Sequence, residues 1–182
     1  MWPVATYHHG DLRTAVLGAA ARIIEKEGLA GLSVREAARR AGVSHNAPYR
    51  HFPDREALLA ALAQEGFALL QKSLESCTGR ELGQAYVRFA LEHPQRFRLM
   101  FGGTLPLGKY PDLQQHARGT FAKLQSAFAG LGTEAEFAAA AAWALVHGLA
   151  QLMLDGHLER GDAFVSKVLG AMRFAATTQR SA

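Results

Sequence analysis

Apolar residues recur along this chain at intervals of three and four, which is the spacing of one face of an α-helix. No long stretch alternates between apolar and polar residues as a half-buried β-strand would. The first helical run is Leu12, Val16, Ala19 and Ile23, and Gly28 stands where a left-handed C-terminal cap would end it. The pattern predicts an all-α protein of about nine helices.

A second, shorter helix is predicted to begin at Ser33. Ser33 and Glu36 form an S-x-x-E capping box, and the next apolar residues are Val34, Ala37, Ala38 and Ala41. Gly42 breaks this helix. Ser44 is a further candidate cap, for a very short helix that must end before Pro53.

A long helix is predicted from Asp54, as its cap, to about Cys77. Its apolar residues form two stripes, one of Leu58, Leu62 and Leu69 and the other of Leu59, Phe67, Leu70 and Leu74. A helix that is apolar on two faces is usually sandwiched between two bodies, so we expect it to be shared between an N-terminal unit and the rest.

Downstream, starts and stops of helices succeed one another to the end of the chain. The signals are His93–Pro94, Gly102–Gly103, a loop over 104–111, a cap at Asp112, a capping box at Thr133–Glu136, and Asp162. The last helix would carry Val165, Val168, Leu169 and Met172.

The stretch Phe137–Leu154 is apolar except for His147 and Gln151, and it reaches the lower length limit of a membrane span. Because much of it is alanine, which contributes little to insertion, we interpret it as a buried helix and expect no membrane partner. Ala140, Ala144 and Gly148 form a small-residue face that fits either a dimer seam or packing within one chain.

Composition adds only broad limits. The chain has 182 residues, one cysteine, and a formal net charge of +4 from 20 basic and 16 acidic side chains. Its length fits one domain or slightly more, and a single cysteine excludes an internal disulfide framework. The N-terminus lacks the apolar run of an export signal, so we expect a soluble, cytoplasmic protein.

The segment from Leu32 to Phe52 carries the most information. Two short helices meet across the glycine-containing turn Ala41–Gly42–Val43, which is what a helix-turn-helix requires. The second helix presents hydrogen-bonding, aromatic or compact residues in place of bulky aliphatic ones, namely His45, Asn46, Pro48, Tyr49 and His51. Such a helix can enter the DNA major groove by its N-terminal end.

Arginines accompany this segment. Arg35, in the first turn of the supporting helix, can reach a guanine edge or a phosphate. Arg39, Arg40 and Arg55 add positive charge nearby, although Arg39 and Arg40 fit a solvated face equally well.

These residues resemble the TetR family of bacterial transcription regulators. The matching string includes Leu32–Ser33–Val34–Arg35–Glu36, Gly42–Val43–Ser44, Tyr49–Arg50–His51–Phe52 and Glu56–Ala57–Leu58–Leu59. In addition, Trp143-x-x-x-His147-Gly148 looks like the subgroup whose ligand domain is named for a W-H-G pattern.

The resemblance implies a homodimer with a three-helix DNA-binding domain over residues 1–53. It implies a ligand-binding and dimerisation domain over 54–182, joined through the helix 54–77. Phosphate contacts would fall to Ser44, Tyr49 and His51, and base contacts to Arg35, His45 and Asn46. The full candidate DNA-binding set is Ser33, Arg35, Ser44, His45, Asn46, Pro48, Tyr49, His51 and Arg55.

A ligand pocket would be lined from the C-terminal part of the chain. The candidates are Phe67, Tyr86, Phe89, Phe97, Met100, Phe101, Tyr110, Phe121, Trp143 and His147. Aromatic residues at helical spacing also fit ordinary core, and His147 fits a hydrogen-bonded core histidine. The ligand expected is a small apolar or amphipathic molecule, whose identity the sequence does not reveal.

The predicted function is a ligand-responsive transcription regulator, a repressor released from a palindromic double-stranded DNA operator by an inducer. The alternatives are a helical adaptor, whose helix-turn-helix binds protein, or an enzyme that uses the C-terminal cavity. The sequence carries no H-E-x-x-H, no G-x-S-x-G and no phosphate-binding glycine loop, so we expect no catalytic residues. The histidines lack metal-site spacing, and we expect no metal and no cofactor.

Overall fold

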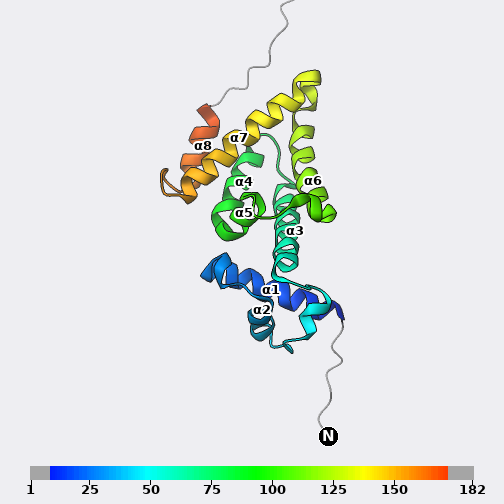
Figure 1. Cartoon of the computed structure of the whole chain (residues 1–182). Helices are drawn as coiled ribbons and strands as arrows, with labels where there is room; N and C mark the ends of the chain where they lie inside the picture. The colour runs from blue at the N-terminus through cyan, green and yellow to red at the C-terminus, as the bar shows by residue number, and fades with distance from the viewer. Residues whose placement is uncertain (1–8, 172–182) are drawn as a thin grey trace, which may run out of the picture. The chain divides into compact units, whose positions relative to one another are not determined.

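The computed structural model describes residues 9–171, and all of the regular structure in that range is helical. It contains eight α-helices and four 3-10 segments, with no strand among the described residues (Figure 1). The all-α prediction is therefore confirmed. Met172, predicted in the last helix, lies outside the described residues. So do the start of the first predicted domain (1–8) and the end of the second (172–182).

Contacts divide the chain into two compact units. The first comprises residues 1–66 and 93–114, and the second comprises residues 67–92 and 115–182. The helix α3 (Arg55–Leu74) and the helix α6 (Pro111–Ala127) each contribute residues to both units. The division into functional domains at residues 53 and 54 stays a prediction.

The first unit is built around α1 (His9–Glu27). This helix packs against η1 (Leu29–Gly31), α2 (Val34–Arg40), η2 (Ala47–Arg50) and α5 (Pro94–Phe101). The short η3 (Leu107–Lys109) comes after α5 in the chain. Fully buried side chains from these elements and the first turns of α3 form the core, including Val16, Ile23, Phe52, Leu58, Leu62 and Phe97. The i, i+3, i+4 spacing in the sequence thus marks a real buried face.

Two glycines end the first two helices as the sequence indicates. Gly28 lies after α1 at φ 74° and ψ 177°, a positive-φ extended conformation that strongly favours glycine, rather than the left-handed helical cap expected. Gly42 lies after α2 at φ 70°. Its N–H donates to the carbonyl of Arg39, and the N–H of Val43 donates to the carbonyl of Ala38. This pair of bonds is a Schellman motif, which turns the chain toward the next segment.

The second unit contains α4 (Arg80–Glu92), most of α6, η4 (Ala129–Glu134), α7 (Ala135–Leu154) and α8 (Asp162–Ala171). The helix α4 packs against both α7 and α8. Buried residues from all three helices form the core here, among them Leu82, Val87, Ala139, Val146, Met153 and Val165.

Three of the predicted helix boundaries are wrong. The helix α6 begins at Pro111 rather than after a cap at Asp112, because proline suits the first helical position, where no backbone donor is needed. No capping box forms at Thr133–Glu136, because η4 already runs through Thr133 and leads directly into α7. The helix α3 is capped by Asp54, as predicted, but ends at Leu74 rather than at about Cys77.

The two-sided pattern of α3 is largely buried. Leu58, Leu62 and Leu70 are fully buried, whereas Leu69 keeps 38% of its surface exposed. Both stripes are therefore buried except at this position.

One segment, Ala129–Leu154, is long and apolar enough to cross a membrane by length and composition, and about a third of its apolar 18-residue window is buried in this chain. Buried Ala139, Val146, Leu149 and Met153 place one face of α7 in the core of the second unit. The opposite face carries exposed apolar side chains, of which Phe137 is 69% exposed.

Candidate nucleic-acid interface and ligand site

The start of α2 is set by Ser33. Its backbone is extended, at φ −136° and ψ 159°, and its hydroxyl accepts the N–H of Glu36 at 3.0 Å. The reciprocal half of the predicted capping box does not form, because arginines occupy the Glu36 carboxylate. Ser33 is thus an N-cap on an exposed helix end, which points backbone N–H groups outward where an anion would be favoured.

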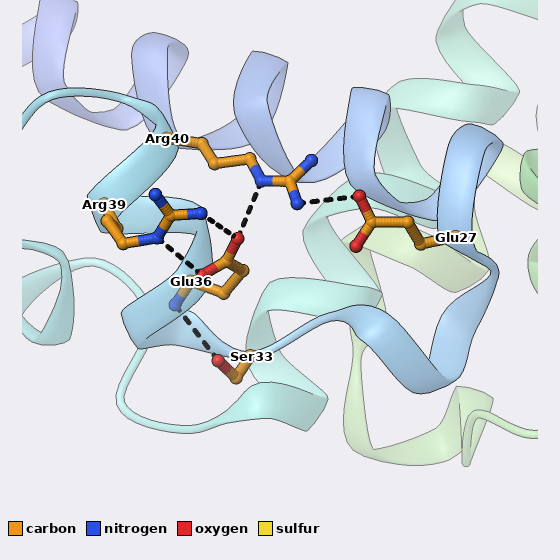
Figure 2. A network of polar contacts seen from close by, with 5 residues as sticks. All are labelled: Glu27, Ser33, Glu36, Arg39 and Arg40. Atoms are coloured by element: carbon orange, nitrogen blue, oxygen red, sulfur yellow. Dashed lines mark hydrogen bonds and ion pairs between the residues drawn. The ribbon is translucent and has the colours of Figure 1, made fainter.

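Arg39 and Arg40 both bind Glu36, as Figure 2 shows. Arg39 donates from Nε and Nη2 at 2.9 and 2.7 Å, and Arg40 donates from Nε at 2.7 Å. The same Arg40 guanidinium reaches Glu27, at the end of α1, at 2.7 Å. These hydrogen bonds lower the pKa of Glu36 to about 2. The network pairs two arginines with carboxylates, and these arginines could otherwise serve as DNA contacts.

The second element of the helix-turn-helix is a 3-10 turn rather than an α-helix begun by a Ser44 cap. Asn46 is the N-cap residue of η2, and no side chain caps it. Pro48 has no N–H to bond the Ser44 carbonyl four residues back, so Ala47 bonds that carbonyl instead, at 3.1 Å. The proline therefore explains the tighter turn.

This turn divides its residues between surface and interior. Ser44, His45 and Asn46 are exposed, and Tyr49 keeps 39% of its surface. Pro48 is buried, and its carbonyl accepts the N–H groups of His51 and Phe52.

His51 lies half-buried beside the ring of Phe52, and its Nε2 is buried without a hydrogen-bond partner among the described residues. A phosphate contact through that nitrogen would require the ring to move.

The arginines of this unit fall into two groups. Arg35 and Arg50 are exposed and make no ion pair or hydrogen bond with any residue that the structure describes. Arg55, in contrast, donates from Nε to the Leu32 carbonyl at 2.8 Å and from Nη2 to the Leu29 carbonyl at 2.5 Å. Arg35 and Arg50 therefore offer the unpaired guanidinium groups of the helix-turn-helix.

Four of the predicted pocket residues meet in the second unit. Trp143 donates from Nε1 to the Tyr86 hydroxyl at 3.1 Å, and this hydroxyl lies 2.9 Å from Nδ1 of His147. The ring of Phe121 lies 5.6 Å from that of Trp143, centroid to centroid. Tyr86 comes from α4, Phe121 from α6, and the other two from α7.

Burial sets the protonation of this cluster. It raises the pKa of Tyr86 and lowers the pKa of His147 below its ordinary value of 6.5. A neutral imidazole can accept at Nδ1, so the Tyr86 hydroxyl can donate to His147 while it accepts from Trp143. The cluster is an uncharged relay of hydrogen bonds with aromatic walls.

The remaining pocket candidates are distributed over both units. Phe67 and Phe89 are buried in the second unit, while Phe97 and Met100 are buried in the first. The ring of Phe101 lies tilted against that of Phe97, with centroids 4.9 Å apart. Tyr110 lines a separate cavity of about 160 Å³ in the first unit, against the Ala57, Ala60 and Ala61 face of α3.

Two carboxylates that hold the first unit together were not singled out from the sequence. Glu25 on α1 accepts the N–H groups of Gln95 and Arg96 at 3.1 and 3.0 Å, and so caps α5, which has no cap of its own. Glu56 on α3 accepts from Lys109 at 2.6 Å and from the Tyr110 hydroxyl at 2.8 Å. The partners lie more than 50 residues apart, so no local spacing could indicate them.

Among the described residues, no group of three or more His, Cys, Asp or Glu side chains is placed to hold a metal ion.

The helix-turn-helix, with its capped α2, exposed polar turn and unpaired arginines, defines the class of helical DNA-binding regulators. Residues 16–62 match the model of the bacterial regulatory proteins of the tetR family, and residues 79–172 match that of the tetracyclin repressor-like C-terminal domain. The chain belongs to the tetR family of transcriptional regulators and is not an enzyme. The W-H-G subgroup stays a prediction.

Solved structures are similar over most of the chain. A protein of unknown function from Rhodococcus sp. RHA1 is 34% identical, with a TM-score of 0.77, and the match covers 92% of this chain and 96% of that one. A tetR-family regulatory protein from Rhodococcus RHA1 is 18% identical over 87% and 93% of the two chains, with a TM-score of 0.63.

AibR, solved in complex with isovaleryl coenzyme A and operator DNA, is 16% identical over 87% and 96% of the two chains, with a TM-score of 0.63. The comparison with curated protein sequences gives no match. The tetR-family protein from Rhodococcus RHA1 and AibR, both below 25% identity, show a shared fold and nothing more.

Proposed function

We propose that this regulator is a cytoplasmic, homodimeric repressor that binds a palindromic operator and is released by a small-molecule inducer. The observation that carries the DNA-binding part is the exposed set Ser44, His45, Asn46 and Tyr49, held on a turn whose Pro48 and adjoining Phe52 are buried. The unpaired guanidinium of Arg35 stands in the neighbouring helix. Such a surface offers donors and positive charge to DNA without giving up the core.

We assign base contacts to Arg35, His45 and Asn46 and phosphate contacts to Ser44 and Tyr49. Ser33 would contribute through the helix end that it caps. Pro48 is left out of this set because it is buried, and His51 stays a candidate that needs its ring to turn.

The direct test is a gel shift with a duplex selected by the protein from a random library, compared with a scrambled duplex of the same composition. We expect salt-sensitive binding that favours the selected duplex by at least about a thousandfold. Tyr49→Ala should weaken binding to both duplexes while the oligomeric state is unchanged. A protein that binds both duplexes equally, or only a protein partner, would favour the adaptor alternative.

The homodimer is proposed from the face of α7 that turns away from the core. This face exposes Phe137 and Leu152 together with the small residues Ala140 and Ala144. Apolar surface of this kind is costly in water, and a second copy of the same helix would cover it. The small residues allow the two backbones to approach closely.

Sedimentation of Ala144→Arg tests the dimer. We expect a monomer, because an arginine in the seam has no partner, whereas Arg118→Ala on α6 should remain a dimer. A wild-type chain that sediments as a monomer at micromolar concentration would refute this part of the proposal.

The inducer is proposed to be a small apolar or amphipathic molecule that binds beside the Tyr86, Phe121, Trp143 and His147 cluster. Support comes from the aromatic walls and neutral polar groups of that cluster. The relative AibR is solved with isovaleryl coenzyme A, which combines an apolar acyl group with a polar carrier. An inducer that favours the DNA-free state by 1–3 kcal/mol would lower operator affinity roughly 5–150-fold.

Trp143 fluorescence can test this site with isovaleryl coenzyme A and medium-chain fatty acids as probes. A saturable change that is lost in Trp143→Phe supports the site, since Trp2 remains as an internal control. Release from DNA without any change in Trp143 fluorescence would place the inducer elsewhere.

A further inference from the structure

Arg55 differs from the other arginines of the helix-turn-helix in what it binds. It is the first residue of α3, and its guanidinium donates to two backbone carbonyls, those of Leu32 at 2.8 Å and Leu29 at 2.5 Å. One carbonyl belongs to the first residue of η1, the short segment between α1 and α2, and the other to the residue directly after it. One side chain therefore connects the start of α3 to the loop that enters α2.

Both carbonyls lie just ahead of α2 in the chain. Leu32 directly precedes Ser33, the N-cap of α2, and Arg35 lies in the first turn of the same helix. The Leu29 carbonyl also accepts the N–H of Leu32 at 3.2 Å, so it closes the turn of η1 as well. Fixing both carbonyls fixes the point from which α2 projects.

Arginine is suited to this task and lysine is not. A guanidinium presents several N–H donors in a rigid, planar fork and can bridge two acceptors at once, whereas an ammonium is a point charge on a flexible stem. With Nε and Nη2 both committed to carbonyls, the side chain is held against its own protein. Arg50, in contrast, is exposed and makes no hydrogen bond with the described residues.

We propose that Arg55 is a positioning residue, which ties the start of α2, and with it Ser33 and Arg35, to the first turn of α3 instead of contacting DNA. This assignment rests on the proposed DNA-binding function and replaces the DNA contact expected for Arg55 from the sequence.

The test compares Arg55→Lys, Arg55→Gln and Arg50→Gln on a duplex selected by the wild-type protein and on its scrambled counterpart, over a range of salt concentrations. For a positioning residue, both Arg55 variants lose affinity for the selected duplex by about tenfold, keep their affinity for the scrambled one, and keep the salt slope. Arg50→Gln, which removes an exposed charge outside the proposed contacts, is the control and should leave the preference for the selected duplex unchanged.

Two results with DNA would overturn the proposal. If Arg55→Lys behaves as wild type while Arg55→Gln loses affinity for both duplexes with a smaller salt slope, then Arg55 is a phosphate contact. If neither variant changes the preference for the selected duplex, the tie does not position α2. Loss of stability alone would not move the ratio between the two duplexes, so this ratio separates positioning from folding.

A second measurement needs neither variants nor DNA. In nitrogen-15 NMR of the wild-type protein, the Nε–H of Arg55 should exchange slowly with solvent, while the Nε–H of Arg50 exchanges fast. Equal exchange of the two groups would contradict the tie. Because this arm uses the free protein, it gives its answer even if no duplex is selected and the proposed function fails.

Discussion

The two compact units organise their polar side chains in opposite ways. In the first unit, Glu36, Arg39 and Arg40 form a charged network on an exposed helix, and Arg39 keeps 64% of its side chain in solvent. In the second unit, Tyr86, Trp143 and His147 form an uncharged network that is partly buried. Glu36 and Arg40 are four residues apart in the sequence, whereas Tyr86 and His147 are 61 residues apart.

The difference separates two uses of a hydrogen bond. Exposed ion pairs contribute little to stability because water and salt compete for both partners. They do, however, decide which arginines stay unpaired, and Arg35 of α2 has no ion-pair partner in the part of the chain that the structure describes. Buried neutral groups contribute more, because a lost partner cannot be replaced by bulk water. The first network therefore shapes a surface and the second holds a core.

The largest effect is expected for Tyr86→Phe. Phenylalanine fills the same space, so the change removes only the hydroxyl that joins Trp143 and His147, and we expect a loss of about 1–3 kcal/mol in the free energy of unfolding. Urea denaturation measures it. Tyr110→Phe removes a hydroxyl bonded to the exposed end of Glu56 and should cost less. Equal losses would contradict the contrast between the two units.

Ser33→Ala comes next in size. Removing an N-cap oxygen that accepts the Glu36 N–H should cost about 1 kcal/mol. Ser44→Ala is the control, since Ser44 caps no helix, and it should stay within about 0.5 kcal/mol of wild type. A larger loss at Ser44 than at Ser33 would show that the start of α2 is held by something other than this cap.

The two networks should fail in different ranges of pH. Burial lowers the pKa of His147, so the stability that it contributes is fully present above the ordinary value of 6.5 and falls as the pH drops below it. Glu36, with its pKa lowered to about 2, contributes stability above 4.5 that is lost only as the pH falls toward 2.

Urea midpoints measured from pH 8 to pH 3 can separate these ranges. His147→Gln should flatten the decline between pH 6.5 and 5, and Glu36→Gln should flatten the decline below 4.5. A decline between pH 6.5 and 5 that persists unchanged in His147→Gln would assign it to another group.

The smallest effect expected is that of salt. Sodium chloride at 1 M shortens the screening length to roughly 3 Å and should erase the difference in stability between wild type and Glu36→Gln. The loss caused by Tyr86→Phe should be the same at low and high salt, because no charge is involved. Thermal melts of both variants at two salt concentrations measure this directly.

Local signals in the sequence predicted local structure well. The first helix, predicted from Leu12, Val16, Ala19 and Ile23, depends on residues within one or two turns, and it is found in the structure. The same holds for the Ser33 cap, the Gly42 break and the Asp54 cap. Where local rules compete, prediction failed. The Glu36 carboxylate was expected to complete a capping box, but it binds two arginines one helical turn away.

Contacts between distant segments were beyond the reach of the sequence. Nothing in the spacing of residues indicated that Arg55 would bind the Leu29 and Leu32 carbonyls or that Tyr86 would meet His147. The order of residues from Ser33 to Phe52 did indicate a helix-turn-helix, because its turn and caps are local. Which of its arginines are paired and which are unpaired depends on tertiary contacts, so the sequence alone could not predict it.

The most direct test of the account uses two arginines of one helix. Arg35 and Arg39 lie four residues apart on α2, both exposed, but only Arg39 is paired with Glu36. On a duplex selected by the wild-type protein, Arg35→Gln should lower affinity and change the preference at one base position, whereas Arg39→Gln should change neither by more than about twofold. Equal effects of the two variants, or a protein that selects no duplex, would contradict it.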